Sequence, residues 1–199
     1  MEKPIRIVQI GLGPVGQMMT PYLNEKKDLK IVGAVDIDPL KVGTDIGLLN
    51  EMSQPTGVTV TSNINEVLDE AQAAVVTTVS ELKTLYPLLE TLIVKGIHIV
   101  STCEELSFPW KTWPSLSKEI DSLAKSHNVS ILGTGINPGF LMDFLPITAT
   151  AICRSIQKIC IKRIQDASSR RLPFRKKIGS SLSVEEFQKK VNQKKIRHV

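Results

Sequence analysis

A glycine-rich hexamer between an apolar segment and a helical segment constrains the fold of this chain more than any other feature. Residues 11–16 read Gly-Leu-Gly-Pro-Val-Gly and directly follow an apolar, largely β-branched run at residues 5–10. Such a run is typical of a buried parallel strand, and residues 14–26 continue with a helical pattern. A glycine turn between a strand and the start of a helix predicts the first unit of an α/β fold.

Strand-like and helical segments continue to alternate as far as residue 133. We expect strands at residues 29–35, 58–61, 73–79, 97–103 and 129–133. We expect helices at residues 63–70, 82–95 and 113–127. Apolar strands that alternate with helices are typical of a doubly wound parallel sheet, and the length fits a Rossmann domain. We therefore predict an NAD(P)-binding Rossmann domain over residues 1–136.

The pattern changes after the last of these strands. Residues 135–139 (Gly-Ile-Asn-Pro-Gly) form a turn-rich joint, followed by an expected apolar helix at 140–153 and an expected antiparallel strand at 155–164. Ser183 and Glu186 have the spacing of a capping box before a short amphipathic helix. We predict the start of an α+β substrate or oligomerisation domain over residues 137–199, and expect it to be partial.

The hexamer has the residue types that bind a dinucleotide. Gly11 permits the tight turn, Gly13 lets the backbone approach a pyrophosphate, and Gly16 lets the helix pack close to the strand. Pro14 fits the first helical position, and Val15 follows it in the first turn. The free N–H groups and the helix dipole at such an N-terminus favour an anion. We expect all five residues to belong to the cofactor site.

Asp36 ends the second expected strand, 20 residues after Gly16. An acid at this place accepts hydrogen bonds from the adenosine ribose hydroxyls. The expected cofactor is NAD or NADP, with NAD favoured because a carboxylate repels a 2′-phosphate. Lys41 lies near enough in the sequence to weaken this preference.

Polar residues follow the fourth, fifth and sixth expected strands, where parallel sheets bind ligands. We expect Thr78, Ser80, Cys103 and Asn137 to line the nicotinamide end of the cofactor site. The alternative for each is ordinary turn and cap chemistry, which Ser, Thr and Asn supply throughout proteins.

Three segments resemble a known enzyme family. Residues 100–106 (Val-Ser-Thr-Cys-Glu-Glu-Leu), 133–140 (Gly-Thr-Gly-Ile-Asn-Pro-Gly-Phe) and 165–173 (Gln-Asp-Ala-Ser-Ser-Arg-Arg-Leu-Pro) are similar to the 2,4-diaminopentanoate dehydrogenases, within the wider dihydrodipicolinate reductase-like group. The resemblance implies NAD(P)-dependent oxidative deamination of 2,4-diaminopentanoate to 2-amino-4-oxopentanoate and ammonia, a step of ornithine degradation. Members of the family are longer, so we expect this chain to be truncated at its C-terminus.

Charged residues near these segments supply candidate catalytic and substrate-binding groups. Glu104 is our candidate to hold the reacting amine or act as general base, and Glu105 our candidate to bind substrate. Arg170 and Arg171 are candidates to grip the substrate carboxylate. The resemblance implies a lysine proton donor, for which Lys177 is the candidate. For each residue the alternative is a solvated loop position.

Charge is distributed unevenly along the chain. Residues 154–199 carry 14 Lys and Arg against 3 Asp and Glu, a net charge of +11, whereas residues 1–153 carry a net charge of −6. A basic tail is compatible with nucleic acid, but this one lacks stacking aromatics apart from Phe174 and Phe187. We expect no nucleic-acid partner. The remaining alternatives are an imine reductase of the lysine pathway and a truncated, non-catalytic NAD(P)-binding protein.

Cysteine content and the N-terminus indicate the compartment. The three cysteines have no ligand-like spacing, so we expect neither a disulfide framework nor a metal site. No secretory signal or membrane-spanning segment is recognisable, which favours a cytoplasmic enzyme without membrane contact. We expect it to form a homo-oligomer and to act on a small diamino acid.

Overall fold

The computed structural model describes residues 3–164, 166–168, 172–193 and 195–196, and within residues 172–193 the side chains of Leu172, Pro173 and Lys177 lie outside the description. The chain forms two compact units, Met1–Ala149 and Thr150–Val199. Residues 137–149, which we expected at the start of the second domain, therefore belong to the first unit. The domain organisation of the whole protein stays a prediction.

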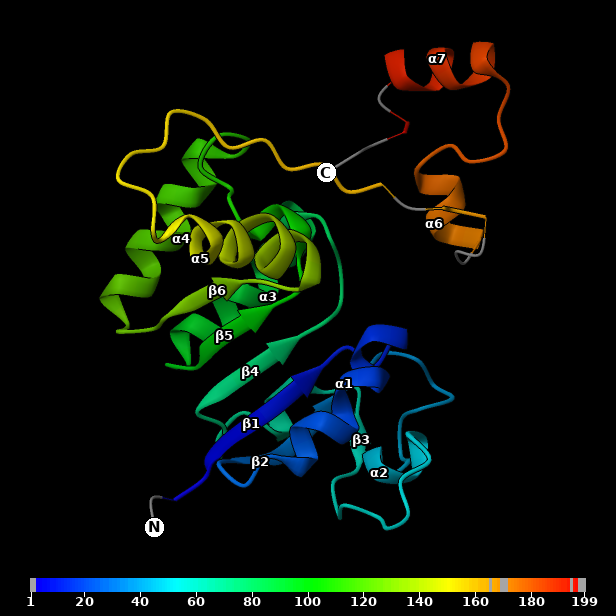
Figure 1. Cartoon of the computed structure of the whole chain (residues 1–199). Coiled ribbons are helices and arrows are strands. Elements are labelled where there is room, and N and C mark those ends of the chain that lie inside the picture. The colour runs from blue at the N-terminus through cyan, green and yellow to red at the C-terminus, as the bar shows by residue number, and fades with distance from the viewer. Residues whose placement is uncertain (1–2, 165, 169–171, 194, 197–199) are drawn as a thin grey trace. The chain divides into compact units, whose positions relative to one another are not determined.

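The first strand, helix and second strand form where the hexamer predicts them. They are β1 (Ile5–Ile10), α1 (Pro14–Glu25) and β2 (Leu29–Val35). Parallel pairing aligns Ile5 with Leu29 and Ile10 with Val35. These three elements form a β-α-β unit, with the glycine turn between β1 and α1 (Figure 1).

The described residues form a six-stranded parallel sheet in the order β3-β2-β1-β4-β5-β6. The remaining strands are β3 (Val60–Thr61), β4 (Ala73–Val76), β5 (His98–Ser101) and β6 (Ile131–Gly133). The order reverses between β1 and β4, which places a topological switch point beside the glycine turn. The predicted doubly wound Rossmann sheet is confirmed.

Helices cover both faces of this sheet. On one face Val8 of β1 belongs to the largest core cluster, together with Leu89 of α3 (Leu82–Val94) and Ile120 of α4 (Pro114–Ser126). On the other face Ile7 of β1 packs with Met19 of α1. Successive β1 side chains therefore point to opposite helical layers, as the pleat of a strand requires.

Short helical turns connect the longer elements. They are α2 (Ile46–Leu49), η1 (Ile64–Glu66) and η2 (Glu104–Leu106). The helix that we expected at 63–70 is reduced to the single turn η1, whose cap is the Asn63 side chain accepting from the Asn65 N–H. A single turn forms few backbone hydrogen bonds for the residues that it fixes, so local helix propensity alone does not extend this turn into a longer helix.

The turn-rich joint at residues 135–139 is confirmed. Asn137, Pro138 and Gly139 interrupt the helical segment η3 (Ile136–Phe144) with non-helical backbone, and Asp143 accepts a hydrogen bond from the Gly139 N–H at 2.8 Å. The helix continues as α5 (Leu145–Thr150). It therefore ends before residue 153, where we expected it to end.

The second unit contains two described helices, α6 (Leu172–Lys177) and α7 (Val184–Asn192). The capping box before α7 is confirmed, because Ser183 accepts from the Glu186 N–H and Glu186 accepts from the Ser183 N–H. The strand expected at 155–164 was wrong. Alternating apolar residues make a strand only when a neighbour pairs with the backbone, and no described strand does so here. In the described part of the chain, no helix is long and apolar enough to span a membrane.

Asp45 organises the loop between α2 and β3. Its carboxylate accepts hydrogen bonds from the N–H groups of Gly47 and Leu48 at the start of α2, and from those of Thr56 and Gly57 across the loop. Burial raises the pKa of this carboxyl, but the four hydrogen bonds outweigh burial, so the pKa is lowered from 3.8. The ionised form is thus favoured in the folded chain.

We expect Asp45→Ala to lower the free energy of unfolding by about 2 kcal/mol at pH 7, since it removes an N-cap and two loop contacts. Because the folded-state pKa lies below the unfolded one, this contribution is complete at neutral pH and is lost as pH falls through 3.8 and below. Urea unfolding of the two proteins at pH 7 and pH 3 measures the difference. An equal difference at both pH values would contradict the assignment.

Candidate dinucleotide site

The glycine turn is held against β2 and α1 by close backbone contacts. Gly11 donates its N–H to the carbonyl of Val35 at 2.8 Å and has a φ of +88°, which favours glycine. A Cβ at Gly16 would lie 2.0 Å from the Gly11 carbonyl oxygen, so the helix start packs directly on the turn. By contrast, a Cβ at Gly13 would meet no atom within 4 Å. The turn is thus packed against backbone at Gly16, whereas space remains beside Gly13.

The N-terminus of α1 provides donors for an anion. Gly13 is the N-cap residue and Pro14 follows in the first turn, where its missing N–H costs nothing. The first internal hydrogen bond of the helix runs from Gln17 to Gly13 at 2.9 Å. The N–H groups of Val15 and Gly16 lie in the first turn of the helix, where backbone N–H groups have no carbonyl acceptor within the helix itself. With the open space at Gly13, this arrangement fits a pyrophosphate.

Asp36 lies at the end of β2, beside the glycine turn. Its Oδ2 accepts from the Leu12 N–H at 2.6 Å and from Lys41 Nζ at 3.3 Å, and its Oδ1 accepts from the Asp38 N–H at 2.9 Å. Burial raises the pKa of this carboxyl, but these three contacts outweigh burial and the pKa is lowered. A carboxylate has about four acceptor positions, so one on Oδ1 is left for a ribose hydroxyl.

Lys41 links Asp36 to Asp38. Its ammonium lies 3.3 Å from Asp36 Oδ2 and 3.4 Å from Asp38 Oδ2, with the Lys41 side chain 18% exposed. A cation therefore stands next to the carboxylate that would read the ribose. It reduces the repulsion of a 2′-phosphate, which is the effect that we considered for Lys41 from the sequence.

The carboxyl ends of the strands are tied together in one row. Thr77 donates its N–H to the carbonyl of Ile10 and Thr102 to that of Val76, while Thr134 does so to Ser101, at 2.8, 3.0 and 2.9 Å. The loops after β4, β5 and β6 consequently begin at the same edge as the glycine turn. This is the edge at which open α/β sheets bind ligands.

Thr77 contacts the glycine turn, a role that sequence reasoning did not assign to it. Its buried hydroxyl donates to the Gly11 carbonyl at 2.5 Å and so holds the turn from the neighbouring strand. The contact follows from the register of β1 against β4, which pairs Ile10 with Val76 and so brings Gly11 next to Thr77. Spacing along the chain does not reveal that register.

The residues expected at the nicotinamide end differ in exposure. Thr78, Ser80 and Asn137 are exposed in the loops after β4 and β6. Cys103 is 1% exposed, and burial raises the pKa of its thiol, so the side chain is a protonated core residue. Contact of these four residues with a cofactor stays a prediction, and Cys103 is buried as a whole residue.

The two adjacent glutamates occupy different surroundings. Both belong to η2 after β5 and both are half-buried. Glu105 Oε2 accepts from the Leu82 N–H at 2.9 Å and from the Trp113 indole at 2.8 Å, so it joins the starts of α3 and α4. Glu105 therefore has a structural use, and its role in substrate binding stays a prediction, as does the catalytic role of Glu104.

The basic candidates belong to the second unit. Arg170 and Arg171 lie outside the described residues. Lys177 is the last residue of α6, but its side chain also lies outside them. Their assigned roles stay predictions.

In the described part of the chain, no group of three or more His, Cys, Asp or Glu could hold a metal ion.

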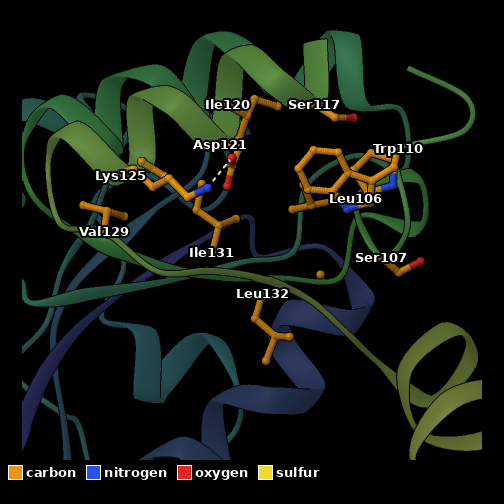
Figure 2. Close-up of a pocket in the computed structure, with 13 residues that line it drawn as sticks. Leu106, Ser107, Trp110, Ser117, Ile120, Asp121, Lys125, Val129, Ile131 and Leu132 are labelled. Atoms are coloured by element: carbon orange, nitrogen blue, oxygen red, sulfur yellow. Dashed lines mark hydrogen bonds and ion pairs between the residues drawn. The ribbon is translucent and has the colours of Figure 1, made fainter. Parts of the chain in front are cut away.

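A separate groove flanks the sheet beside β6 (Figure 2). Its volume is about 380 Å³, and its walls come from α4, β6 and the segment after β5. Trp110 lies at one end, and the ion pair of Asp121 with Lys125, at 2.7 Å, lies at the other. Ile131 and Leu132 point to opposite sides of β6 (Figure 2). The glycine turn and Asp36 do not line this groove.

Comparison with known sequences connects this geometry to one family. Residues 5–104 match the family described as "Dihydrodipicolinate reductase, N-terminus". The chain is 34% identical over 198 residues to 2,4-diaminopentanoate dehydrogenase of Acetoanaerobium sticklandii, an alignment that covers 97% of this chain and 55% of that protein. The chain thus spans about half the length of this relative.

Solved structures give the same picture of the fold. Amine dehydrogenase from Mycobacterium smegmatis superposes with a TM-score of 0.68 at 33% identity, over 75% of this chain and 45% of that one. GenD2 from gentamicin A biosynthesis, solved in complex with NAD, has a TM-score of 0.58 at 20% identity, over 77% of this chain and 40% of its own. The second likeness concerns the fold alone.

Proposed function

The chain belongs to the family of dihydrodipicolinate reductase N-terminal domains, and from this premise we propose that its first unit binds a nicotinamide dinucleotide and that the protein is an NAD(P)-dependent oxidoreductase. The observation that carries the proposal is the open space at Gly13 in front of the α1 N-terminus, with Asp36 beside it. NAD is favoured over NADP because Asp36 keeps its negative charge at neutral pH.

The proposed substrate is an amino acid that carries a second amine, with 2,4-diaminopentanoate as the candidate. Support comes from the relative named 2,4-diaminopentanoate dehydrogenase and from the likeness to an amine dehydrogenase. The products would be 2-amino-4-oxopentanoate and ammonia, with water supplying the new carbonyl oxygen, as in ornithine degradation. When bound, the dinucleotide supplies the hydride acceptor for the carbon that bears the amine.

The residues of this chain would bind the cofactor, orient the substrate and remove a proton from its ammonium group. The first turn of α1 would hold the pyrophosphate through backbone N–H groups, and Asp36 would accept from a ribose hydroxyl. Glu104 would take a proton from the substrate ammonium as a general base. By the family resemblance, Arg170 or Arg171 would bind the substrate carboxylate, and Lys177 would donate a proton to the nitrogen that leaves as ammonia.

Assembly and location are part of the same proposal. A homo-oligomer is supported by Val100 and Leu132, which are paired on adjacent strands and 38% and 56% exposed. A cytoplasmic location fits the free cysteines Cys103, Cys153 and Cys160.

Calorimetric titration with NAD⁺ and NADP⁺ tests cofactor binding. We expect saturable binding of both, with NAD⁺ tighter, because the carboxylate of Asp36 disfavours a 2′-phosphate. Adenosine, which has no phosphate, is the control and should bind far more weakly. Absence of NAD⁺ binding by a chain with a cooperative unfolding transition would contradict the proposal.

Turnover is a second, independent measurement. NADH formation, followed by its absorbance, tests 2,4-diaminopentanoate as the substrate. Oxidation of NADPH in the presence of a cyclic imine tests the reductase alternative. Because the chain spans 55% of its relative, binding without turnover would favour a non-catalytic NAD(P)-binding role for these 199 residues.

A further inference from the structure

Gln9 is a polar side chain one residue before the end of β1, with no exposed surface. Burying an amide is costly unless its groups are hydrogen-bonded. Here Nε2 donates to the Gly16 carbonyl at 2.6 Å, and Oε1 accepts from the Thr20 hydroxyl at 3.0 Å. The Gly16 carbonyl can only accept, which fixes the orientation of the amide. Gln9 therefore joins β1 to the first and second turns of α1.

Thr20 completes this network from the helix. It is also fully buried, and its hydroxyl lies 3.1 Å from the same Gly16 carbonyl, four residues earlier in α1. The one hydroxyl proton is shared between Gln9 and Gly16 as acceptors. The network thus converges on one acceptor, the carbonyl of Gly16.

Gly16 is the residue at which the helix rests on the glycine turn. Its Cα faces the Gly11 carbonyl so closely that a Cβ would lie 2.0 Å from that oxygen. Its own N–H belongs to the first turn, which supplies the donors of the site. The carbonyl that Gln9 and Thr20 hold is joined to this N–H through the Gly16 Cα, so a shift of the carbonyl also displaces the N–H relative to the turn.

We propose that Gln9 and Thr20 are positioning residues that hold the first turn of α1 in its pyrophosphate-binding geometry before the dinucleotide arrives. This inference rests on the proposed function, which places the pyrophosphate at Gly13. Without the network the turn populates other geometries, and the apparent affinity falls by the fraction that remains competent. The loss should be equal for every ligand that carries the pyrophosphate.

A purely structural network would alter stability without altering affinity. Ser117 provides a matched control, because it is 2% exposed and its hydroxyl donates to the Trp113 carbonyl at 2.7 Å, four residues earlier in α4. Ser117→Ala removes the same kind of buried helix contact away from the glycine turn. It should lower the urea midpoint and leave the Kd for NAD⁺ unchanged.

The experiment measures the Kd of the full chain for NAD⁺ and ADP-ribose by calorimetry, alongside urea unfolding. We expect Gln9→Met to raise both Kd values about ten-fold. Thr20→Val should raise the Kd for NAD⁺ and the Kd for ADP-ribose by the same factor, whereas Thr20→Ser should have the wild-type values. The effects of Gln9→Met and Thr20→Val should be less than additive in the double variant.

The outcomes separate the inference from the function on which it rests. If the folded wild-type chain binds neither ligand, the proposed function fails and the inference fails with it. If wild type binds and Gln9→Met or Thr20→Val binds equally well, the positioning role is overturned while the function stands. If Gln9→Met does not fold, the comparison of Thr20→Val with Thr20→Ser decides.

Discussion

Replacing Gly16 by alanine is expected to lower the affinity for NAD⁺ by at least about 100-fold and to destabilise the first unit by about 3 kcal/mol. The added Cβ would lie 2.0 Å from the Gly11 carbonyl oxygen and 2.7 Å from the Thr77 hydroxyl. The first obstacle is backbone, so the helix start must move away from the turn. Calorimetry and urea unfolding of the full chain measure the two effects.

Gly13→Ala is the matched control for this substitution. A Cβ at Gly13 meets no atom within 4 Å, and the backbone there has a φ of −66° that any residue adopts. Stability should change by less than about 0.5 kcal/mol. Affinity should still fall roughly ten-fold, because the methyl group would stand where the pyrophosphate approaches. Wild-type affinity in Gly13→Ala would place the pyrophosphate elsewhere, even if Gly16→Ala failed to fold.

Asp36→Ala is expected to weaken NAD⁺ binding about 30-fold, the effect of losing a charged acceptor for the ribose. The same change removes one of the two carboxylates paired with Lys41, whose ammonium lies 3.3 Å from Asp36 and 3.4 Å from Asp38. A cation with one carboxylate partner fewer attracts a 2′-phosphate more strongly, so NADP⁺ should lose less affinity than NAD⁺ or gain some. Parallel titrations with both cofactors measure the change in preference.

Two further variants identify the cause of that change. Asp38→Ala removes the other carboxylate near Lys41, at 3.4 Å, but leaves Asp36 and its contact with the Leu12 N–H in place. It should retain the preference for NAD⁺. Adding Lys41→Ala to Asp36→Ala should abolish the advantage of NADP⁺. An unchanged preference in Asp36→Ala itself would show that this carboxylate does not face the ribose.

Local patterns were sufficient to predict the first half of the fold. The strand at Ile5–Ile10, the helix beginning at Pro14 and the strand at Leu29–Val35 are each encoded by their own residues. Glycine spacing, and an acid at the end of the second strand, are also properties of short segments. For this reason the candidate site around Gly11, Gly16 and Asp36 could be proposed from the sequence, and its role in binding a cofactor stays a prediction.

Prediction failed where an element depends on distant partners. The alternation at residues 155–164 resembles a strand, but a strand requires pairing that no described strand provides. The helix expected at 63–70 is a single turn for a related reason, since short helices need tertiary packing to persist. Glu105 illustrates the same limit, because its bonds to Leu82 and Trp113 join segments that are apart in sequence.

The sequence by itself therefore determined the Rossmann class, the glycine turn and the acid at the end of β2, because periodicity and turn chemistry act over a few residues. Only the tertiary structure decided that Thr77 holds the Gly11 carbonyl, that Gln9 holds the Gly16 carbonyl and that Lys41 forms an ion pair with Asp36. The physical reason is register. These contacts arise when strands and helices align in space, at distances of 2.5 to 3.3 Å, and the spacing of residues along the chain does not specify that alignment.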